Sequence, residues 1–368
     1  MKYDYLIVGA GFSGAVFAER AASQLNKKVL IVEKRNHIGG NAYDEYDENG
    51  ILIHRYGPHI FHTNSKEVFD YLSKFTEWRK YEHKVLANYQ GELFPIPINR
   101  ITINKFFSLD LKTEEEVKKF LESKAEKRYP IKNSEDIIVN QIGWKLYEAF
   151  FKHYTKKQWN LFPNQLSPSV CGRIPIRFND DCRYFTDKFQ FMPKDGYTKL
   201  FEKMLNHKNI EIILNTDYKK IINDIKCDKM VYTGPIDYYF DYIHGKLPYR
   251  SIRFEWETIN SEFYQKTAQV NYVDNKKEFT RVIEHKRLSG NNSNVTTISK
   301  EYPQVDGEPF YPVPNDDNRK LFMNYKHESE KLKSVVFCGR LAEYQYYNMD
   351  QVIINTIIMI KQKIFYES

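Results

Sequence analysis

The chain has 368 residues, enough to bury a large hydrophobic core and to divide into two or three domains. Its 55 basic and 48 acidic residues give a net charge of +7, but the basic residues are spread out and form no run typical of a nucleic-acid-binding arm. A small anionic ligand fits this charge pattern better than nucleic acid does. The four cysteines lie far apart without a CxxC pair, which argues against a cysteine zinc site and a disulfide framework and favours a reducing cytoplasm.

The sequence predicts no membrane segment. The start, MKYDYLIVGAGF, lacks the architecture of a signal peptide, and the apolar stretch at 352–360 is too short and too polar to span a bilayer. We therefore expect a soluble, cytoplasmic protein without membrane insertion.

The first predicted elements are a strand, a glycine-rich turn, a helix and a second strand. Residues 5–8 are typical of a buried strand, 15–25 of a helix rich in small residues, and 29–32 of a strand that ends at Glu33. Between strand and helix, Gly9, Gly11 and Gly14 form GxGxxG, and Glu33 follows 19 positions beyond Gly14. This context predicts a bound dinucleotide, because the glycines admit a pyrophosphate to the helix N-terminus and Glu33 can accept from a ribose hydroxyl.

A second glycine pair, Gly39-Gly40, follows Glu33 within KRNHIGGNAY. It makes another turn at which the backbone can approach a ligand closely. A glycine pair after the acidic residue is typical of FAD-binding members of this fold rather than of simple dehydrogenases. We therefore predict FAD as the cofactor.

Further strands and helices are expected along the rest of the chain. Strands that end near glycine are predicted at 211–214, in KMVYTGP before Gly234, and in SVVFCGR before Gly339. Helices are predicted after an Asn64–Glu67 capping box up to Trp78, after a Thr113–Glu116 capping box, and over 135–151. A hairpin at Gln90-Gly91 and alternating stretches between 250 and 286 predict an antiparallel sheet.

The predicted fold class is α/β, with a discontinuous FAD-binding Rossmann-like domain that receives two insertions. We assign residues 1–80, 188–240 and 318–368 to the FAD-binding domain and 100–160 to an inserted helical domain. An inserted antiparallel β-sheet domain that contacts substrate takes 81–99, 161–187 and 241–317.

Ten sequence blocks, in order along essentially the whole chain, match one known family. They are GAGFSG at 9–14, EKRNHIGGNAY at 33–43, YGPHIFHTN at 56–64, YTKKQW at 154–159, GYTKL at 196–200, YTGPIDYYF at 232–240, LPYRSIRFE at 247–255, TRVIEHK at 280–286, EPFYPV at 308–313 and GRLAEYQYY at 339–347. Together they resemble the bacterial UDP-galactopyranose mutases.

The resemblance implies an enzyme that interconverts UDP-galactopyranose and UDP-galactofuranose for cell-surface polysaccharide synthesis. The net reaction is redox-neutral, yet this family needs its FAD reduced, because N5 of the reduced flavin attacks C1 of the sugar and UDP leaves and later returns. The implied partner is the nucleotide sugar, and a homodimer follows from family analogy alone.

The resemblance also implies site residues. Arg173 and Arg281 would hold the substrate diphosphate and His62 would lie beside the reactive part of the flavin, so these three are the expected catalytic residues. Expected cofactor contacts are Gly9, Gly11, Phe12, Ser13, Gly14, Glu33, Lys34, Gly40, Asn41, His59, Ile60, Arg340, Asn348, Met349 and Asp350. Expected substrate contacts, besides the two arginines, are His83, Phe150, Tyr154, Thr155, Trp159, Tyr184, Arg250, Asn271, Tyr311 and Tyr346.

Aromatic side chains are expected to form part of the substrate site. In YTKKQW, Tyr154 or Trp159 would stack on uracil, and Phe150, one helical turn earlier, is expected on the same side. The chain has 28 Tyr and 25 Phe, and this surplus becomes informative only if tyrosines gather with arginines at one site.

The histidines of YGPHIFHTN raise the question of a metal. His59 and His62 have no Cys or carboxylate beside them in this stretch, so we predict no metal site. A buried, hydrogen-bonded histidine without a catalytic role is the main alternative for His59. For Arg250 and Arg177, a surface charge or a structural ion pair is an equal alternative.

Three positions depart from the family pattern. Asn348 stands where Asp is common, His83 where some relatives have Asn, and Phe191 where a small residue is expected. The last two leave the sugar open, so a mutase acting on UDP-N-acetylgalactosamine or dTDP-fucose is the nearest alternative. A flavin amine or porphyrin oxidase and a flavin-binding regulatory protein without catalysis are more distant alternatives.

Overall fold

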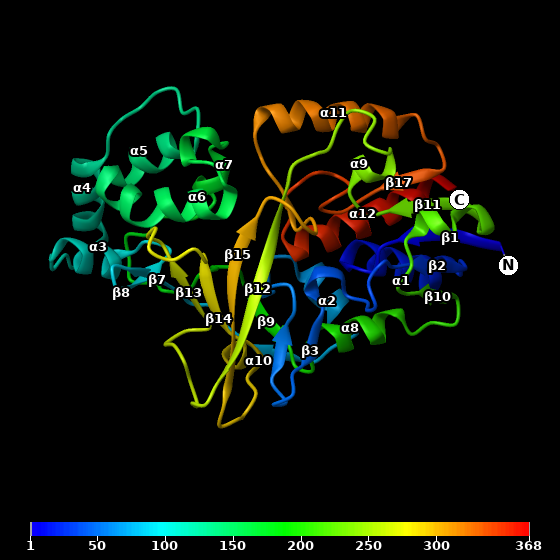
Figure 1. Ribbon diagram of the computed structural model, residues 1–368, viewed down its shortest axis with the longest axis horizontal. Helices are drawn as coiled ribbons and strands as arrows, with labels where there is room; N and C mark the ends of the chain where they lie inside the picture. Colours follow the sequence, from blue (N-terminus) through cyan, green and yellow to red (C-terminus); the bar gives the residue numbers. More distant parts are fainter. Residues whose placement is uncertain (1, 368) are drawn as a thin grey trace.

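A computed structural model describes residues 2–367, with side chains described as far as residue 362. In Figure 1 a parallel sheet with its helices lies on the right together with the N-terminus, a cluster of helices lies on the left, and a long antiparallel sheet lies between them. No helix among the described residues is long and apolar enough to cross a membrane.

The parallel sheet has five strands in the order β10-β2-β1-β11-β17. They are β1 (Lys2–Val8), β2 (Val29–Val32), β10 (Ile210–Ile213), β11 (Lys226–Tyr232) and β17 (Val335–Phe337). Every residue of β2 is buried, as expected for a parallel strand that is covered on both faces. The helices associated with this part are α1 (Phe12–Leu25), α2 (Lys66–Leu72), α8 (Gly196–Leu205), α9 (Ile236–Tyr239), α11 (Asp316–Glu330) and α12 (Met349–Glu367).

The antiparallel sheet has seven strands in the order β16-β12-β15-β14-β13-β7-β8. They are β7 (Val85–Tyr89), β8 (Glu92–Ile96), β12 (Tyr249–Ile259), β13 (Gln269–Tyr272), β14 (Arg281–Glu284), β15 (Thr296–Gln304) and β16 (Tyr311–Pro312). Only β13 and β7 pair in parallel within it. The hairpin predicted at Gln90-Gly91 is confirmed, with positive φ angles of 54° and 92° that suit a tight two-residue turn.

The helical cluster contains α3 (Arg100–Phe107), α4 (Glu114–Lys124), α5 (Ser134–Tyr147), a π-helical turn at Glu148–Lys152, α6 (His153–Trp159) and α7 (Ser169–Gly172). Its apolar side chains share one core with those of β7 and β8, which fixes the helices to that end of the sheet. The Thr113–Glu116 capping box at the start of α4 is confirmed.

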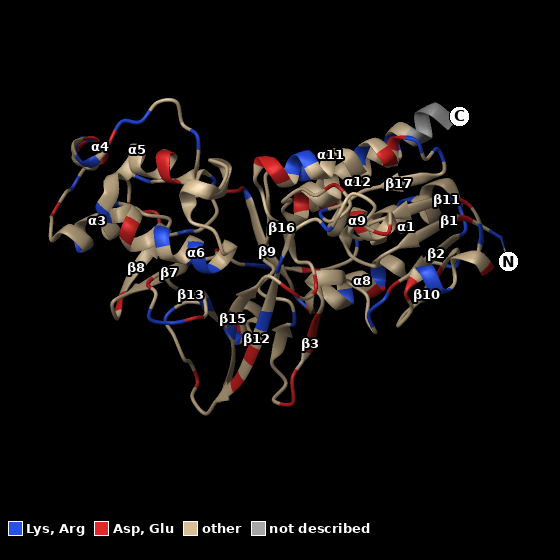
Figure 2. Ribbon diagram, turned by 45° about the horizontal axis from the view of Figure 1, so that its top comes forward, with Lys and Arg blue, Asp and Glu red and all other residues tan. Residues whose placement is uncertain are grey.

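Small elements connect these parts. Two short sheets pair β3 (Asp44–Tyr46) with β4 (Leu52–His54), and β5 (Phe61–Thr63) and β6 (Trp78–Lys80) with β9 (Phe189–Pro193). The remaining helices are α10 (His285–Ser289) and the 3₁₀ turns at Gly40–Ala42, Pro163–Gln165, Tyr218–Lys220 and Ile222–Asp224. Acidic and basic residues are interspersed over most of the elements that Figure 2 shows.

The structure confirms the α/β class and corrects two local predictions. The cap of α2 is Ser65, whose hydroxyl accepts from the Val68 N–H, while the Asn64 amide donates to Asp187 at 2.7 Å. The helix ends at Leu72, and Trp78 begins strand β6 instead of continuing the helix.

Residues 161–187, which were expected in the sheet domain, contain no named strand. They begin with a 3₁₀ turn and with α7, whose Val170 and Cys171 share the core of the helical cluster, and only an isolated bridge joins Arg183 to Lys84. We propose to keep the three-part domain division with residues 161–172 moved to the helical part.

Candidate active site

The glycine-rich turn borders a cavity of about 870 Å³ at the carboxyl ends of β1, β2 and β11. This edge of a parallel sheet is where ligands bind in such folds. Of the predicted cofactor contacts, those that line the cavity are Gly9, Gly11, Phe12, Ser13, Glu33, Lys34, Gly40, Asn41, His59, Arg340 and Met349. Gly14, Ile60, Asn348 and Asp350 do not line it, and the cofactor roles of all fifteen residues remain predictions.

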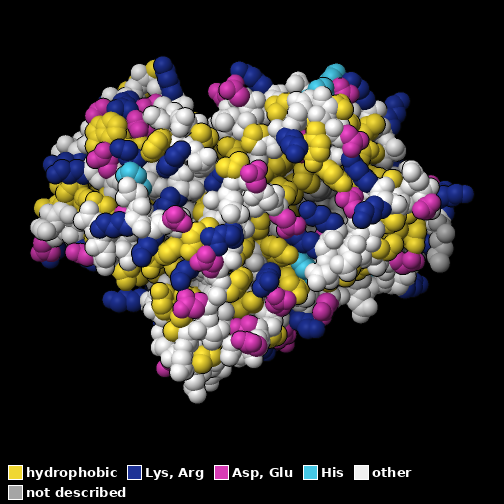
Figure 3. Space-filling view, in the orientation of Figure 1, with side chains coloured by type: hydrophobic (Ala, Val, Ile, Leu, Met, Phe, Trp, Pro, Cys, Tyr) yellow, Lys and Arg dark blue, Asp and Glu magenta, His cyan; other side chains and the backbone are white. Residues whose placement is uncertain are grey.

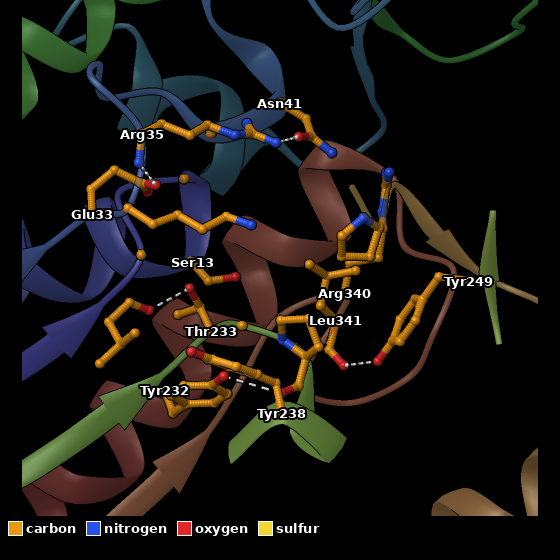
Figure 4. Close-up of a pocket in the computed structure, with 18 of the residues that line it drawn as sticks. Ser13, Glu33, Arg35, Asn41, Tyr232, Thr233, Tyr238, Tyr249, Arg340 and Leu341 are labelled. Carbon is orange, nitrogen blue, oxygen red and sulfur yellow. Dashed lines mark hydrogen bonds between the residues drawn. The ribbon is translucent and has the colours of Figure 1, made fainter. Parts of the chain in front are cut away.

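The sequence reasoning missed the opposite wall of this cavity. Figure 4 shows Thr233, which donates to the Val8 carbonyl at 2.7 Å, together with Tyr232, Tyr238 and Tyr249. Tyr232 and Thr233 stand at the end of β11, Tyr238 is on α9, and Tyr249 begins β12. The block YTGPIDYYF contained the signal, because a tyrosine-rich stretch follows a strand of the parallel sheet directly.

Two glycine turns approach their neighbours too closely for side chains at Gly9 and Gly40. Gly9 has a φ of +103°, and a Cβ there would lie 2.2 Å from Thr233 Oγ1. A Cβ on Gly40 would lie 2.9 Å from the Gly11 Cα, so the two turns touch. A Cβ on Gly11 would meet only the Gly40 Cα, at 3.7 Å, and Gly11 lines the cavity. This cradle fits the close approach of a pyrophosphate.

The acidic residue at the end of β2 is held in place by backbone groups. The Glu33 carboxylate accepts from the Ala10 N–H at 2.8 Å and from the Arg35 N–H at 2.9 Å, which leaves lone pairs for ribose hydroxyls. Glu308 pairs with both neighbouring cations, at 2.8 Å from Arg35 and 3.5 Å from Lys34. Because these cations are already compensated, the site favours a dinucleotide without a 2′-phosphate.

The two histidines of YGPHIFHTN have different surroundings. His59 lines the cavity, its Nδ1 lies 2.9 Å from the Gly57 carbonyl oxygen, and burial lowers its pKa to about 3, so the ring is neutral. His62 lies on β5, with its Nδ1 2.9 Å from an Asp187 oxygen and its ring stacked on Phe185 at 3.6 Å. Among the described residues, no group of three or more His, Cys, Asp or Glu side chains is placed to hold a metal.

Arginines and tyrosines from distant parts of the chain gather next to this cavity. The guanidinium carbons of Arg173 and Arg340 lie 4.5 Å and 5.2 Å from the centre of the Tyr346 ring. That ring lies 5.8 Å from Tyr311, and Trp159 packs edge-on to Tyr311 at 5.5 Å. Arg173, aided by Arg340, lowers the pKa of Tyr346 to about 8. We call these five residues the arginine–tyrosine cluster.

Arg281 belongs to a row of side chains that crosses the antiparallel sheet. Asn271, Arg281 and Glu301 lie in register on β13, β14 and β15. Arg281 Nε donates to Glu301 at 2.6 Å, and the side chain of Glu301 is only 1% exposed. Burial lowers the pKa of Arg281, but the charge of Glu301 and the nearby Tyr154 together raise it by more. The net shift is upward, so the side chain stays a cation. The sequence reasoning missed Glu301, although a carboxylate at a core-facing strand position is a signal.

A polar chain continues from this row towards His62. Gln269 donates to Asn271 at 2.8 Å, and its amide oxygen lies 3.3 Å from His83 Nε2. Burial lowers the pKa of His83 to about 4, so this ring is also neutral. His83 packs against Tyr184, at 5.8 Å, and Phe185. The structure therefore brings His62, His83 and Tyr184 together around Phe185.

The predicted nucleotide contacts on α6 are placed differently from one another. Trp159 belongs to the arginine–tyrosine cluster, and burial raises the pKa of Tyr154 to about 12 although Arg281 opposes the shift. Thr155 Oγ1 instead lies 3.6 Å from Cys171 Sγ on α7. Phe150 is on the π-helical turn before α6 and packs against Phe94 at 5.3 Å, and its position on the same side as Tyr154 stays a prediction.

Three more expectations can be compared with the structure. Arg250 is buried and its Nε donates to the Gln158 carbonyl at 2.9 Å, and Arg177 donates to the carbonyls of Asp181 and Tyr184, so both have structural contacts. Phe191 packs against Phe69 at 5.1 Å, within the core around the parallel sheet. It therefore gives no support to the idea that this residue reshapes a sugar pocket.

The arginine–tyrosine cluster is reached through a second cavity of about 720 Å³, lined by α7, α11 and residues 342–348. Trp159, Arg173 and Tyr346 form part of its wall, and Asn348 lines it as well. The space-filling view shows a notch between the helical cluster and α11 at this place (Figure 3). An anionic ligand can approach the cluster from solvent here.

A parallel sheet that ends at a glycine cradle defines a Rossmann-like dinucleotide-binding protein, and the family model for NAD(P)-binding Rossmann-like domains matches residues 7–75. A second family model, for UDP-galactopyranose mutase, matches residues 149–346, which include Arg173, Arg281 and Tyr346. The chain belongs to the UDP-galactopyranose mutase family, a family of isomerases.

Known relatives agree with this assignment over nearly the full length. A protein from Klebsiella pneumoniae named probable UDP-galactopyranose mutase is 38% identical, over 95% of this chain and 92% of that one. A dTDP-fucopyranose mutase from Escherichia coli is 37% identical, over 95% of both chains. A crystal structure of reduced UDP-galactopyranose mutase superposes with a TM-score of 0.79 at 15% identity, covering 98% of this chain and 95% of that one, and shows the likeness of fold.

Proposed function

We propose that the chain is an FAD-dependent mutase that interconverts UDP-galactopyranose and UDP-galactofuranose without net oxidation. The observation that carries this proposal is the gathering of Arg173, Arg340, Tyr311 and Tyr346 next to a cavity that suits a dinucleotide. A cofactor and an anionic substrate can thus meet at one place. Reduced FAD, when bound, supplies the nucleophile for C1 of the sugar.

The arginines would act on the diphosphate. Negative charge builds up on a diphosphate leaving group as its bond to C1 breaks, so fixed cations stabilise the transition state more than the ground state. Arg281 is held in one orientation by Glu301. Arg173 has no ion pair with a carboxylate among the described residues, so its charge is available to the ligand.

The sugar would lie near His62, His83 and Tyr184. His62 and His83 both pack against Phe185. His83 is neutral, and a neutral ring suits hydrogen bonding to hydroxyl groups rather than to phosphate. From the family resemblance we also propose that the protein is a cytoplasmic homodimer and that it supplies galactofuranose for cell-surface polysaccharides.

A second candidate substrate is dTDP-fucose. One relative named dTDP-fucopyranose mutase is about as similar to this chain as one named probable UDP-galactopyranose mutase, at 37% against 38% identity. Overall similarity therefore does not separate the two sugars.

A substrate panel tests the proposal. Chemically reduced, FAD-loaded protein is mixed separately with UDP-galactose, UDP-N-acetylgalactosamine and dTDP-fucose, and the furanose products are separated by chromatography. We expect the largest kcat/KM with UDP-galactose. A preference for dTDP-fucose would establish the second candidate. Absence of turnover with all three, together with reduction of the oxidised flavin by amines or porphyrinogens, would identify an oxidase instead.

A further inference from the structure

Lys157 of α6 donates to the backbone of a distant turn. Its Nζ lies 2.6 Å from the Tyr272 carbonyl oxygen, 3.0 Å from that of Lys277 and 3.1 Å from that of Phe279. Tyr272 is the last residue of β13, and Lys277 and Phe279 lie in the connection between β13 and β14. No carboxylate makes an ion pair with Lys157 among the described residues, so these oxygens surround the ammonium as they would a bound cation.

This contact joins two parts of the proposed substrate site. The helix α6 carries Tyr154 and Trp159 on either side of Lys157 in the sequence, and Phe279 stands two positions before Arg281. Figure 1 shows α6 on the side of the helical cluster that faces the sheet. The bonds of Lys157 therefore connect the helix expected to hold the nucleoside with the strand whose arginine is expected to hold the diphosphate.

Other contacts of the connection do not replace this link. The Tyr272 N–H donates to the Thr280 carbonyl at 2.8 Å, which closes the base of the turn, and the Val273 N–H donates to Asn88 at 3.2 Å. The Thr280 N–H donates to the Glu301 carbonyl at 2.8 Å. These bonds tie the connection to neighbouring strands and not to α6, and residues 275–278 at its tip are exposed.

We propose that Lys157 is a positioning residue, which fixes the separation between the aromatic face of α6 and the Arg281 guanidinium and so matches the site to a nucleoside diphosphate. The proposal rests on the proposed function. A nucleoside diphosphate must reach both groups at once, and a displacement of about 1 Å between them is enough to lower a rate about a hundredfold. Lys157 acts through Arg281 and contacts no substrate itself.

Three substitutions test this role. Lys157→Met keeps the aliphatic stem and removes all three bonds, and Lys157→Arg keeps a cation that can donate to the same carbonyls. Lys156→Met is the matched control, because Lys156 is the adjacent lysine and its Nζ donates at 2.8 Å to Asn160, at the end of its own helix. The measurements are the Kd for UDP, KM, kcat, FAD content and Tm of the FAD-loaded protein.

We expect Lys157→Met to raise the Kd for UDP about tenfold and to lower kcat by a similar factor, with FAD content unchanged. Lys157→Arg should restore both values to within about threefold of wild type, and Lys156→Met should change neither. Unchanged UDP binding and kcat in Lys157→Met would overturn the proposal. If Lys157→Met does not fold, Lys157→Leu takes its place, because leucine has no donor either, and wild-type UDP binding by that variant would overturn the proposal equally.

A double-mutant cycle separates positioning from general stabilisation. If Lys157 acts through Arg281, adding Lys157→Met to Arg281→Ala should raise the Kd for UDP by less than about twofold beyond Arg281→Ala alone. Additive effects would show that Lys157 acts independently of Arg281 and would contradict the inference. A wild-type protein that does not bind UDP would refute the proposed function itself. This outcome is distinct from additive or non-additive effects of the two substitutions.

Discussion

Arg281 and Glu301 lie directly opposite each other on neighbouring antiparallel strands, and the arginine Nε donates to the buried carboxylate at 2.6 Å. The second carboxylate oxygen, Oε1, has no hydrogen-bond partner among the described residues and lies 3.1 Å from the position that a Cβ on Gly57 would occupy. Gly57 belongs to the loop that leads to His59 in the dinucleotide cavity. Glu301 thus adjoins both the proposed diphosphate cation and the proposed cofactor loop.

We predict that Glu301→Gln lowers kcat about tenfold or more. The substitution keeps the shape but replaces a charge-assisted hydrogen bond by a weaker one and leaves the buried Arg281 cation uncompensated. The control is Glu257→Gln, which removes an exposed carboxylate 2.9 Å from Lys300 on the same sheet and should leave kcat and Tm unchanged. Steady-state kinetics and thermal unfolding measure both. Near-wild-type kcat in Glu301→Gln would show that Arg281 needs no fixed partner.

Replacement of the arginines should reduce turnover without loss of cofactor. We expect Arg281→Ala to lower kcat about a hundredfold, the size expected when a preorganised electrostatic contact is removed. Arg173→Ala should impair both KM and kcat, and Lys should rescue either position poorly because it cannot bind a phosphate in bidentate fashion. Neither arginine lines the dinucleotide cavity, so the flavin absorbance per protein should stay normal. Wild-type kinetics in both variants would mean that the substrate site lies elsewhere.

Tyr346 should make UDP binding depend on pH. Its pKa is lowered from the ordinary value of 10.0 to about 8 by Arg173, so the ring ionises above about pH 8 and then repels a diphosphate. We expect the Kd for UDP to rise above this pH, together with an increase in tyrosinate absorbance.

The same titration should make stability depend on pH. The pKa of Tyr346 is lower in the folded protein than in the unfolded chain, so ionisation of this ring stabilises the fold. This contribution is complete above pH 10.0 and is lost as the pH falls through about 8.

Two variants check the assignment of this titration. Tyr346→Phe should abolish the absorbance change near pH 8, and Arg173→Met should move that change upward towards pH 10.0. Tyr347→Phe is the control. Tyr347 is next to Tyr346 in the sequence, and burial raises its pKa, so it does not ionise near pH 8. An absorbance change near pH 8 that persists in Tyr346→Phe would assign it to another tyrosine.

Local signals in the sequence predicted the local parts of the fold. GxGxxG between a strand and a helix, the Thr113 capping box and the Gln90-Gly91 hairpin each depend on residues that are near in sequence, and the structure has all three. The capping box predicted at Asn64 is wrong because of a residue distant in sequence. The Asn64 amide donates to Asp187, and Ser65 caps the helix instead.

The parts that were not predicted depend on register between distant segments. Glu301 pairs with Arg281 only because β14 and β15 align in this register, and a shift by one residue would turn either side chain to the opposite face. Lys157 lies in a matched block, but its three acceptors are backbone carbonyls, which every residue has and which leave no mark in the sequence. The arginine–tyrosine cluster was predicted from family resemblance and not from spacing.

Glycine substitutions should separate folding from cofactor binding. A Cβ on Gly11 meets nothing in the protein closer than 3.7 Å but stands at the cavity wall, so Gly11→Ala should fold and bind little FAD. A Cβ on Gly9 would lie 2.2 Å from Thr233 Oγ1 at a φ of +103°, so Gly9→Ala should lose both stability and FAD. Flavin absorbance and thermal unfolding of both variants test this. Normal FAD content in Gly11→Ala would place the pyrophosphate away from this turn.

The redox dependence of turnover tests the central claim most directly. FAD-loaded protein is prepared fully oxidised or fully reduced with dithionite under anaerobic conditions, UDP-galactofuranose is added, and formation of UDP-galactopyranose is followed by chromatography. We predict turnover by the reduced protein, no net flavin oxidation during it, and no turnover by the oxidised protein, because the nucleophile is available only in the reduced cofactor. Equal turnover in both redox states, or flavin oxidation in step with product formation, would contradict the account.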